Sequence, residues 1–304
     1  MGQILDWCGR ACWLLGVLAA ATLAGVSLAG ASLADEAPRR GALLYEVRAP
    51  GGQNPSYLFG TIHSEDPRIL DLPGPVLTAF ADSPAFALEV VPDTEAIIKS
   101  MVTMTYTDGR TLREVLPADM YPEVAAALQG LGMPPAAFRD FKPWAVLTLI
   151  SVPPAGSGEF LDMRLYRTAK EADKRILGLE SMEEQLAVFD DMGESDQIAL
   201  LREALGSRDE LPVMFESLIE AYLARNLDTL MERSEHYLQG NDPRLAALFR
   251  EAAVESRNRR MAQRMLPLFD QGGWFIAVGA LHLPGVNGIL SLVEQKGYRV
   301  TPVH

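Results

Sequence analysis

Short apolar segments near both ends of the chain are the feature that most constrains its fold. Each is only a few residues long and is bounded by glycine, proline or charged residues, so each predicts a buried strand rather than a helix. The predicted strands are Ala42–Val47, Ser56–Phe59, Ala85–Val91, Arg175–Leu179, Trp274–Val278 and Tyr298–Val303. Because strands must pair to satisfy their backbone groups, the first and last segments predict one sheet built from both ends of the chain.

The sequence between these segments is mainly helical in pattern. Apolar residues recur at helical spacing through about 94–150 and again through 182–266, where the longest predicted helix is Pro243–Leu266. We therefore predict an α/β fold, with a single mixed β-sheet core formed by N- and C-terminal segments and a mainly helical insertion or cap, in one domain over residues 35–304. The Pro- and Gly-rich segment Val152–Gly158 is the best linker candidate, and Asp162 after it occupies the position of a helix N-cap.

The N-terminal 34 residues have the pattern of a secretory signal peptide. Residues Ala11–Ala34 carry no charge, Arg10 precedes them, and Ser32 and Ala34 suit the −3 and −1 positions of a cleavage site. The uncharged stretch is also long enough to span a bilayer, so an uncleaved N-terminal membrane anchor is the alternative. Either outcome predicts export of the globular part across the inner membrane, to the periplasm in a bacterial cell.

Composition excludes several classes of function. The formal net charge is −13 and no basic run is interleaved with aromatic residues, so nucleic acid is not an expected partner. Both cysteines, Cys8 and Cys12, lie in the predicted signal peptide. The exported part therefore has no thiol for a disulfide, a cysteine nucleophile or a Cys-ligated zinc site.

Four apolar strand segments, Ser56–Phe59, Phe86–Leu88 within Ala85–Val91, Arg175–Leu179 and Trp274–Val278, each terminate at or next to a polar residue. These residues are His63, Glu89, Glu180 and His282, and the two histidines stand in Gly-x-x-His turns that begin at Gly60 and Gly279. In open α/β sheets, ligands bind outside the carboxyl ends of the strands. Parallel strands would therefore bring the four residues together. Each glycine would allow a sharp turn beside a ligand, because it has no side chain and a free φ.

Two imidazoles and one or two carboxylates suit a divalent Mn, Co, Fe or Zn ion. Such a metal lowers the pKa of bound water, and a carboxylate outside the ligand set can accept the proton. His63, His282 and Glu89 are the candidate ligands, and Glu180 is a further ligand or proton acceptor.

Each residue also has a purely structural interpretation. A histidine at a strand end is often only a hydrogen-bonded loop residue, and a carboxylate such as Glu180 can be the N-cap of the next helix. Arg257 and Asn258 stand on the long predicted helix, where they either face the site and hold a substrate group or belong to a solvated face with neighbouring arginines.

The residues around these motifs resemble the TraB/GumN family, the bacterial relatives of the Tiki metalloproteases. The resemblance runs from about Leu43 to Val303 and is carried by five stretches, LLYEVRAPGGQNPSYLFGTIHSEDP, FALEVV, FLDMRLYRTAKEADKRILGLESMEEQLAVFD, SRNRRMAQRML and WFIAVGALHLPGVNGILSLVEQKGYRVTPV. It implies a fold shared with erythromycin-esterase-like and ChaN-like proteins and a metal-dependent peptidase activity in the Tiki branch.

Position by position, the resemblance implies functional roles for residues of this chain. The family's first Gly-x-x-His motif falls on Gly60 and His63, its glutamate on Glu89, and its second motif on Gly279 and His282. Glu180, Arg257 and Asn258 fall on further characteristic positions, which favours the functional interpretation of the last two.

Two functions from different classes follow. The first is an exported metal-dependent hydrolase, a peptidase acting on a peptide or small-molecule substrate, in which Arg257 binds the substrate or a developing oxyanion. The alternative is a non-catalytic periplasmic protein that binds a peptide, iron or haem in the same place, because a fold does not by itself determine turnover. A third, an accessory protein whose helical cap docks a partner, predicts a protein without metal.

Overall fold

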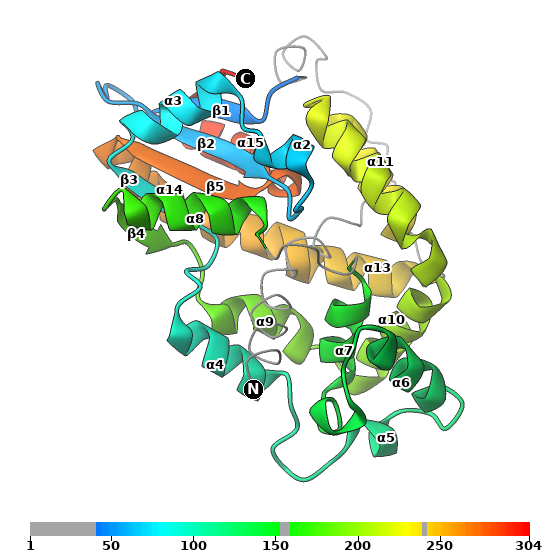
Figure 1. Cartoon of the computed structure of the whole chain (residues 1–304). Helices are drawn as coiled ribbons and strands as arrows, with labels where there is room; N and C mark the ends of the chain where they lie inside the picture. The colour runs from blue at the N-terminus through cyan, green and yellow to red at the C-terminus, as the bar shows by residue number, and fades with distance from the viewer. Residues whose placement is uncertain (1–40, 153–158, 239–241) are drawn as a thin grey trace.

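A six-stranded mixed sheet with its covering helices forms one side of the molecule (Figure 1). The computed structural model describes residues 41–152, 159–238 and 242–304. Within them the strands lie side by side in the order β4-β3-β5-β2-β1-β6. Their bounds are β1 (Leu44–Arg48), β2 (Ser56–Thr61), β3 (Ala85–Leu88), β4 (Arg175–Gly178), β5 (Trp274–Gly279) and β6 (Arg299–Pro302).

The four strands that precede the predicted site residues are parallel. β2 pairs with β5, β5 with β3, and β3 with β4, with Phe59 opposite Ala277 and Ala87 opposite both Ile276 and Leu177. β1 pairs antiparallel with both of its neighbours, the edge strand β6 and β2, with which it forms a hairpin. The prediction of one mixed sheet built from N- and C-terminal segments is confirmed.

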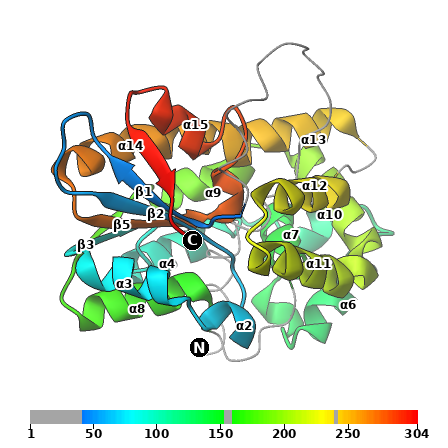
Figure 2. The same cartoon turned by 90° about the horizontal axis from the view of Figure 1, so that it is seen from above.

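Helices cover both faces of this sheet. Figure 2 shows α3 (Gly74–Asp82) and α8 (Leu161–Glu171) on one face, and α14 (Ser256–Gln271) and α15 (Ile289–Glu294) on the other. Every residue of β3 is buried, and so are the first five residues of β5, as expected for parallel strands covered on both faces.

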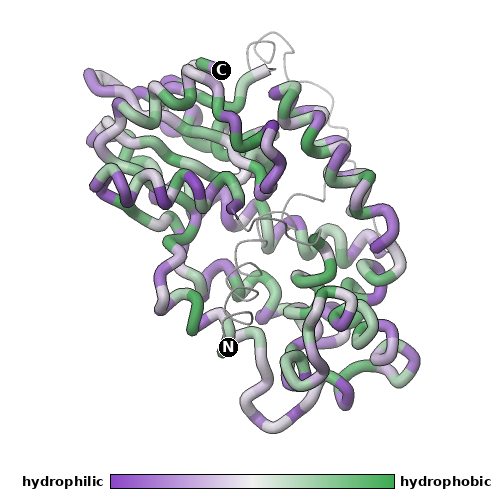
Figure 3. The backbone as a smooth tube through the Cα atoms, viewed as in Figure 1, coloured by the Kyte–Doolittle hydropathy of each residue, from purple (hydrophilic) through white to green (hydrophobic). Residues whose placement is uncertain are grey.

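Aromatic packing fixes α3 on the sheet. The Phe80 ring of α3 lies 5.2 Å from the Phe275 ring of β5 and 5.6 Å from the Phe86 ring of β3, both in edge-on geometry. Such ring pairs contribute about 0.5–1.5 kcal/mol each beyond their buried area. Figure 3 shows apolar strands between the covering helices, which carry polar residues on their outer sides.

The rest of the chain is a helical region beside the sheet (Figure 1). Its elements are α2 (Pro67–Leu70), α4 (Thr94–Thr103), α5 (Leu112–Val115), α6 (Tyr121–Gly130), η2 (Pro135–Ala137), α7 (Pro143–Ile150), α9 (Met182–Asp190), α10 (Glu194–Gly206), η3 (Arg208–Glu210), α11 (Leu211–Leu223), α12 (Leu227–Leu238) and α13 (Pro243–Arg250).

The helical region has a hydrophobic core of its own, centred on α7. Every residue of α7 is buried, which accounts for its apolar sequence on all sides. Trp144 stacks on Phe189 of α9 with ring centroids 5.8 Å apart and donates its Nε1–H to Asp190 Oδ1 at 2.9 Å. Helices α11 and α12 instead belong to the same apolar cluster as the sheet, through side chains that include Leu218 and Leu230.

The predicted helix Pro243–Leu266 is interrupted and extended. A turn of π-helix at Glu251–Glu255 separates α13 from α14, and α14 continues to Gln271 with Pro267 inside it. π-Turns are frequent near functional sites. This one directly precedes Arg257 and Asn258.

Two predictions fall outside the described residues. These are the signal peptide over residues 1–34 and most of the linker over Val152–Gly158. In the described ranges, no helix combines the length and the apolar character needed to cross a membrane.

Candidate functional site

The four predicted site residues lie at one edge of the sheet. His63 and His282 follow β2 and β5, while Glu89 and Glu180 follow β3 and β4. All four are buried, with exposed fractions between 2% and 8%. His63, Glu89 and His282 are near enough for their charges to influence one another's pKa. The structure therefore brings together residues from both ends of the chain.

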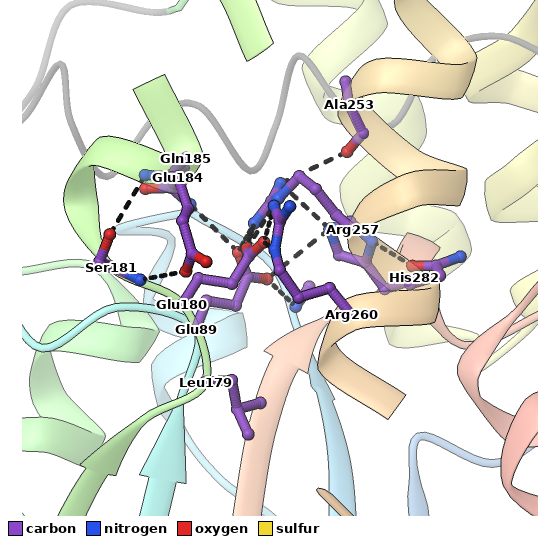
Figure 4. Close-up of polar contacts among 12 residues, drawn as sticks. Glu89, Leu179, Glu180, Ser181, Glu184, Gln185, Ala253, Arg257, Arg260 and His282 are labelled. Atoms are coloured by element: carbon purple, nitrogen blue, oxygen red, sulfur yellow. Dashed lines mark hydrogen bonds and ion pairs between the residues drawn. The ribbon is translucent and has the colours of Figure 1, made fainter. Parts of the chain in front are cut away.

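Arg257 joins the two glutamates. Its side chain enters from α14 and is 1% exposed, with Nη2 2.6 Å from Glu89 Oε2 and Nε 2.8 Å from Glu180 Oε2 (Figure 4). Burial opposes the charged forms of Glu89 and Arg257, but the attraction between their opposite charges outweighs it. The pKa of Glu89 is lowered to about 2, and that of Arg257 is raised.

Glu180 is fully engaged by arginines. Its Oε2 accepts from Arg257, and its Oε1 accepts from both Nε, at 2.9 Å, and Nη2 of Arg260. The alternative interpretation as a helix N-cap is wrong, because Ser181 caps α9 and forms a reciprocal capping box with Glu184.

Glu89 is also held on its other oxygen. Oε1 accepts the backbone N–H of Gly279 at 2.7 Å and lies 3.8 Å from His282 Nε2. Gln185 donates to Oε2 at 3.3 Å. The carboxylate therefore has a fixed orientation beside the second histidine.

Asn258 orients His282. The Asn258 side-chain nitrogen donates to the Asn287 carbonyl at 2.9 Å, which turns its Oδ1 toward His282 Nδ1 at 2.6 Å. His282 Nδ1 must then be the donor, so Nε2 carries the lone pair. Burial lowers the pKa of His282 to about 4, and the ring is neutral at pH 7. The solvated-face interpretation of Arg257 and Asn258 is wrong for both, since each is buried.

Asp162 orients His63 and is a site residue that the sequence prediction missed. Its Oδ2 lies 2.7 Å from His63 Nδ1, and its Oδ1 accepts from Thr61 Oγ1 at 2.6 Å. The N-cap assignment of Asp162 is wrong, because Phe160 is the cap and Asp162 lies in the first turn of α8. The sequence did contain an indication of this buried position, because Asp162 lies on the apolar side of that helix together with Leu161 and Leu165.

The electrostatic environment of His63 differs from that of His282. Burial disfavours its imidazolium form, but the charge of Asp162 and the hydrogen bond to it outweigh burial and raise the pKa of His63. The two histidines therefore have their pKa values shifted in opposite directions, although they lie at neighbouring strand ends.

The two motif glycines are required by close packing. A Cβ on Gly60 would lie 2.8 Å from Leu283 Cδ1 and 3.0 Å from Ala280 Cα, so the two Gly-x-x-His turns pack directly on each other. A Cβ on Gly279 would lie 3.3 Å from Glu89 Oε1. Neither glycine has a positive φ, so of the two expected reasons the free φ is wrong and the absence of a side chain is the one that applies.

The residues fit a metal in chemistry, although their side chains are not arranged as a closed ligand set. Each histidine bonds a side-chain oxygen through Nδ1, which is how metal-binding histidines are commonly oriented. Yet in the parts of the chain that the structure describes, no three His, Cys, Asp or Glu residues form a group that could hold an ion. Arg257 Nη1 lies 3.5 Å from His282 Nε2.

A comparison with known families identifies the chain. The model of the TraB/PrgY/gumN family matches residues 43–302. This chain belongs to that family. The resemblance inferred from the motifs, which runs from about Leu43 to Val303, is therefore confirmed over residues 43–302.

Curated relatives of this TraB/PrgY/gumN member include proteins named as metalloproteases. Metalloprotease TIKI2 of Danio rerio is 25% identical over 85% of this chain, and metalloprotease TIKI1 of Homo sapiens is 25% identical over 81% of it. The matched regions cover 60% and 59% of those relatives, so the chain spans only part of their length. An uncharacterized protein of Treponema pallidum is 24% identical, with 84% of this chain and 80% of that protein covered. No solved structure gives a significant match.

Proposed function

We propose that this chain is an exported metal-dependent hydrolase, a peptidase by class, acting at the carboxyl edge of the four parallel strands. The observation that carries the proposal is the matched anchoring of two histidines. Asp162 holds Nδ1 of His63, and Asn258 holds Nδ1 of His282, which leaves Nε2 of each ring as the nitrogen with the lone pair. The similarity to proteins named as metalloproteases supports the same conclusion.

The residues that would hold the metal are His63, His282 and Glu89. Their nitrogen and oxygen atoms suit a divalent Mn, Co, Fe or Zn ion. When bound, such an ion supplies a water of lowered pKa and polarises a carbonyl group. Because Arg257 Nη1 lies 3.5 Å from His282 Nε2, a cation held by His282 would have to compete with the guanidinium for this nitrogen.

The other charged groups orient the site. Both oxygens of Glu180 accept from arginines, so we assign it to holding Arg257 rather than to ligation or proton transfer. Arg257 in turn holds Glu89 ionised and in place. We keep for Arg257 the role of binding a substrate oxygen beside the two histidines, because its guanidinium lies 3.5 Å from His282 Nε2.

Elemental analysis of the purified protein tests the proposal most directly. We expect a bound divalent metal in the wild type and loss of it in His63→Gln and His282→Gln, with His304→Gln as the matched control outside the site. Cleavage of a peptide library with added Mn or Co should stop after chelation. Cleavage that survives in His63→Ala or His282→Ala would refute the proposal.

A second candidate is a periplasmic protein that binds a peptide, iron or haem without turnover. The observation in its favour is that Arg257 already neutralises Glu89. An absorbance change on haem addition, or a stoichiometric complex with uncleaved peptide, would favour this candidate over the hydrolase.

Export to the periplasm is part of both proposals. Fractionation of spheroplasts would separate the two forms, because a released protein stays in the supernatant and one anchored by its N-terminal segment sediments with the spheroplasts.

A further inference from the structure

Three buried side chains, Thr61, His63 and Asp162, form a hydrogen-bonded chain that connects the end of β2 to α8. Asp162 of α8 is 99 residues from His63 and 101 from Thr61, yet it contacts both. The exposed fractions are 8% for His63, 4% for Asp162 and 1% for Thr61. Water therefore cannot readily replace either contact, and both hydrogen bonds depend on α8 packing against the sheet.

The geometry of these contacts selects one tautomer of the His63 ring. A carboxylate accepts hydrogen bonds and does not donate them, so His63 Nδ1, at 2.7 Å from Oδ2, must carry the proton. The lone pair of the neutral ring is then on Nε2. Thr61 donates to the other carboxylate oxygen at 2.6 Å, and this second bond prevents the carboxylate from rotating away from the ring.

We propose that Asp162 is a positioning residue for His63, and that Thr61 acts through it by fixing the plane of the carboxylate. The pair determines which His63 nitrogen is available to a ligand and the direction in which that nitrogen faces. That the ligand is a divalent metal rests on the proposed function, whereas the choice of tautomer does not.

The two histidines are held by different chemistry, which sharpens the proposal. His282 bonds an amide oxygen of Asn258, whereas His63 bonds a carboxylate oxygen of Asp162. A carboxylate partner makes an imidazole a stronger electron donor than an amide partner does. His63 is therefore the stronger of the two nitrogen donors, and loss of Asp162 should weaken cation binding more than a structural defect elsewhere in the same turn.

The chain offers a control for such a defect. Tyr222 of α11 donates its hydroxyl to the Gly60 carbonyl at 2.8 Å, so it holds the same turn without bonding His63. Tyr222→Phe removes one buried hydrogen bond from the turn and leaves Asp162 and Thr61 in place. A general loosening of the turn would affect this variant as much as Asp162→Ala.

The first test is the tautomer of His63 in metal-free protein, measured by long-range ¹H–¹⁵N correlation NMR. The chain has only 4 histidines, and His63→Gln assigns the signal. At a pH where the ring is neutral, wild type, Tyr222→Phe and Asp162→Asn should have the Nδ1–H form, since the asparagine oxygen can still accept. Asp162→Ala should have a mixture in which the Nε2–H form is prominent, and Thr61→Val an intermediate one. The same Nδ1–H form in Asp162→Ala as in wild type would overturn the proposal.

The second test is the affinity for Co(II), measured by competition with a chromophoric chelator. Asp162→Ala should weaken Co(II) binding about 10–100-fold, which is typical for loss of a residue that orients a metal-binding histidine. Tyr222→Phe should change it little. Equal affinity of wild type and Asp162→Ala would refute the positioning role. If wild type binds no Co(II), the proposed function fails, and the NMR result alone decides the role of Asp162.

Discussion

Arg257 and Glu89 are 168 residues apart in the sequence, and their charged groups meet at 2.6 Å with both side chains almost fully buried. Glu180 lies on the same guanidinium at 2.7 Å. An arginine buried in this way is stable only with its carboxylates in place, and the reverse is equally true. Arg257, Glu89 and Glu180, called the triad below, therefore connect α14 to the ends of β3 and β4.

Removal of the guanidinium should destabilise the protein strongly. Arg257→Met leaves two buried carboxylates without their shared partner, and we expect a loss of about 3–5 kcal/mol in the free energy of unfolding. Urea denaturation followed by circular dichroism measures this loss. Arg259→Met, an exposed arginine on the same helix, is the control and should change stability by less than about 1 kcal/mol. Equal losses in the two variants would contradict the interpretation of the triad.

Substitution of Gly60, the glycine of the first Gly-x-x-His turn, should destabilise the protein only because there is no room for a Cβ. In Gly60→Ala the new Cβ meets Leu283 Cδ1 at 2.8 Å and the backbone Cα of Ala280 at 3.0 Å. We expect a loss of about 1–3 kcal/mol from overpacking, with Leu283→Ala in the same chain relieving only the side-chain part. Gly74→Ala is the control, since a Cβ there meets nothing within 4 Å. A fully stable Gly60→Ala variant would mean that the two turns are not in contact.

The sheet was predictable because its strands have clear local patterns. Four short apolar segments end at or shortly before His63, Glu89, Glu180 and His282, and the rule that ligands gather at the carboxyl ends of parallel strands places these residues together. The structure has all four strands parallel and adjacent. Both the architecture and the location of the candidate site therefore followed from sequence.

The contacts within the site were less predictable, because they depend on tertiary packing. Asp162 has the sequence context of a helix cap, and only the docking of α8 on the sheet turns its carboxylate toward Thr61 and His63. The engagement of Glu180 by Arg257 and Arg260 likewise depends on the path of α14 past the sheet. No local sequence pattern encodes either arrangement. The one local indication was Asp162 itself, an acidic residue on the apolar side of its helix.

Acid should destabilise the protein over a defined pH range because of His282. Burial lowers its folded-state pKa to about 4 from an ordinary value of 6.5. Between these values the unfolded chain binds more protons than the folded one, so stability falls as the pH falls from 6.5 to 4, by on the order of 3 kcal/mol. Glu89, whose pKa is lowered to about 2, adds a loss in the same direction below about pH 4.5.

Comparison of pH slopes isolates the contribution of His282. Urea unfolding measured at several pH values should give a shallower slope between pH 6.5 and 4 for His282→Gln than for wild type. The slopes are compared, because the substitution also lowers stability at every pH. His304→Gln should keep most of the wild-type slope. Parallel slopes in His282→Gln and wild type would contradict a neutral, buried His282.

Binding of a divalent cation should raise the melting temperature in a way that depends on both histidines. A ligand that binds only the folded state adds about 2.7 kcal/mol at a concentration 100 times its Kd. Differential scanning fluorimetry with Mn, Co or Zn, after chelation and dialysis, should show a rise for wild type and His304→Gln that is lost in His63→Gln and His282→Gln. Arg257 Nη1 lies 3.5 Å from His282 Nε2. Arg257→Lys should therefore change the size of the cation-induced rise in melting temperature relative to wild type, provided that His282 is intact. If His63→Gln and His282→Gln are stabilised as much as wild type, the cation binds elsewhere and the two Gly-x-x-His turns do not form its site.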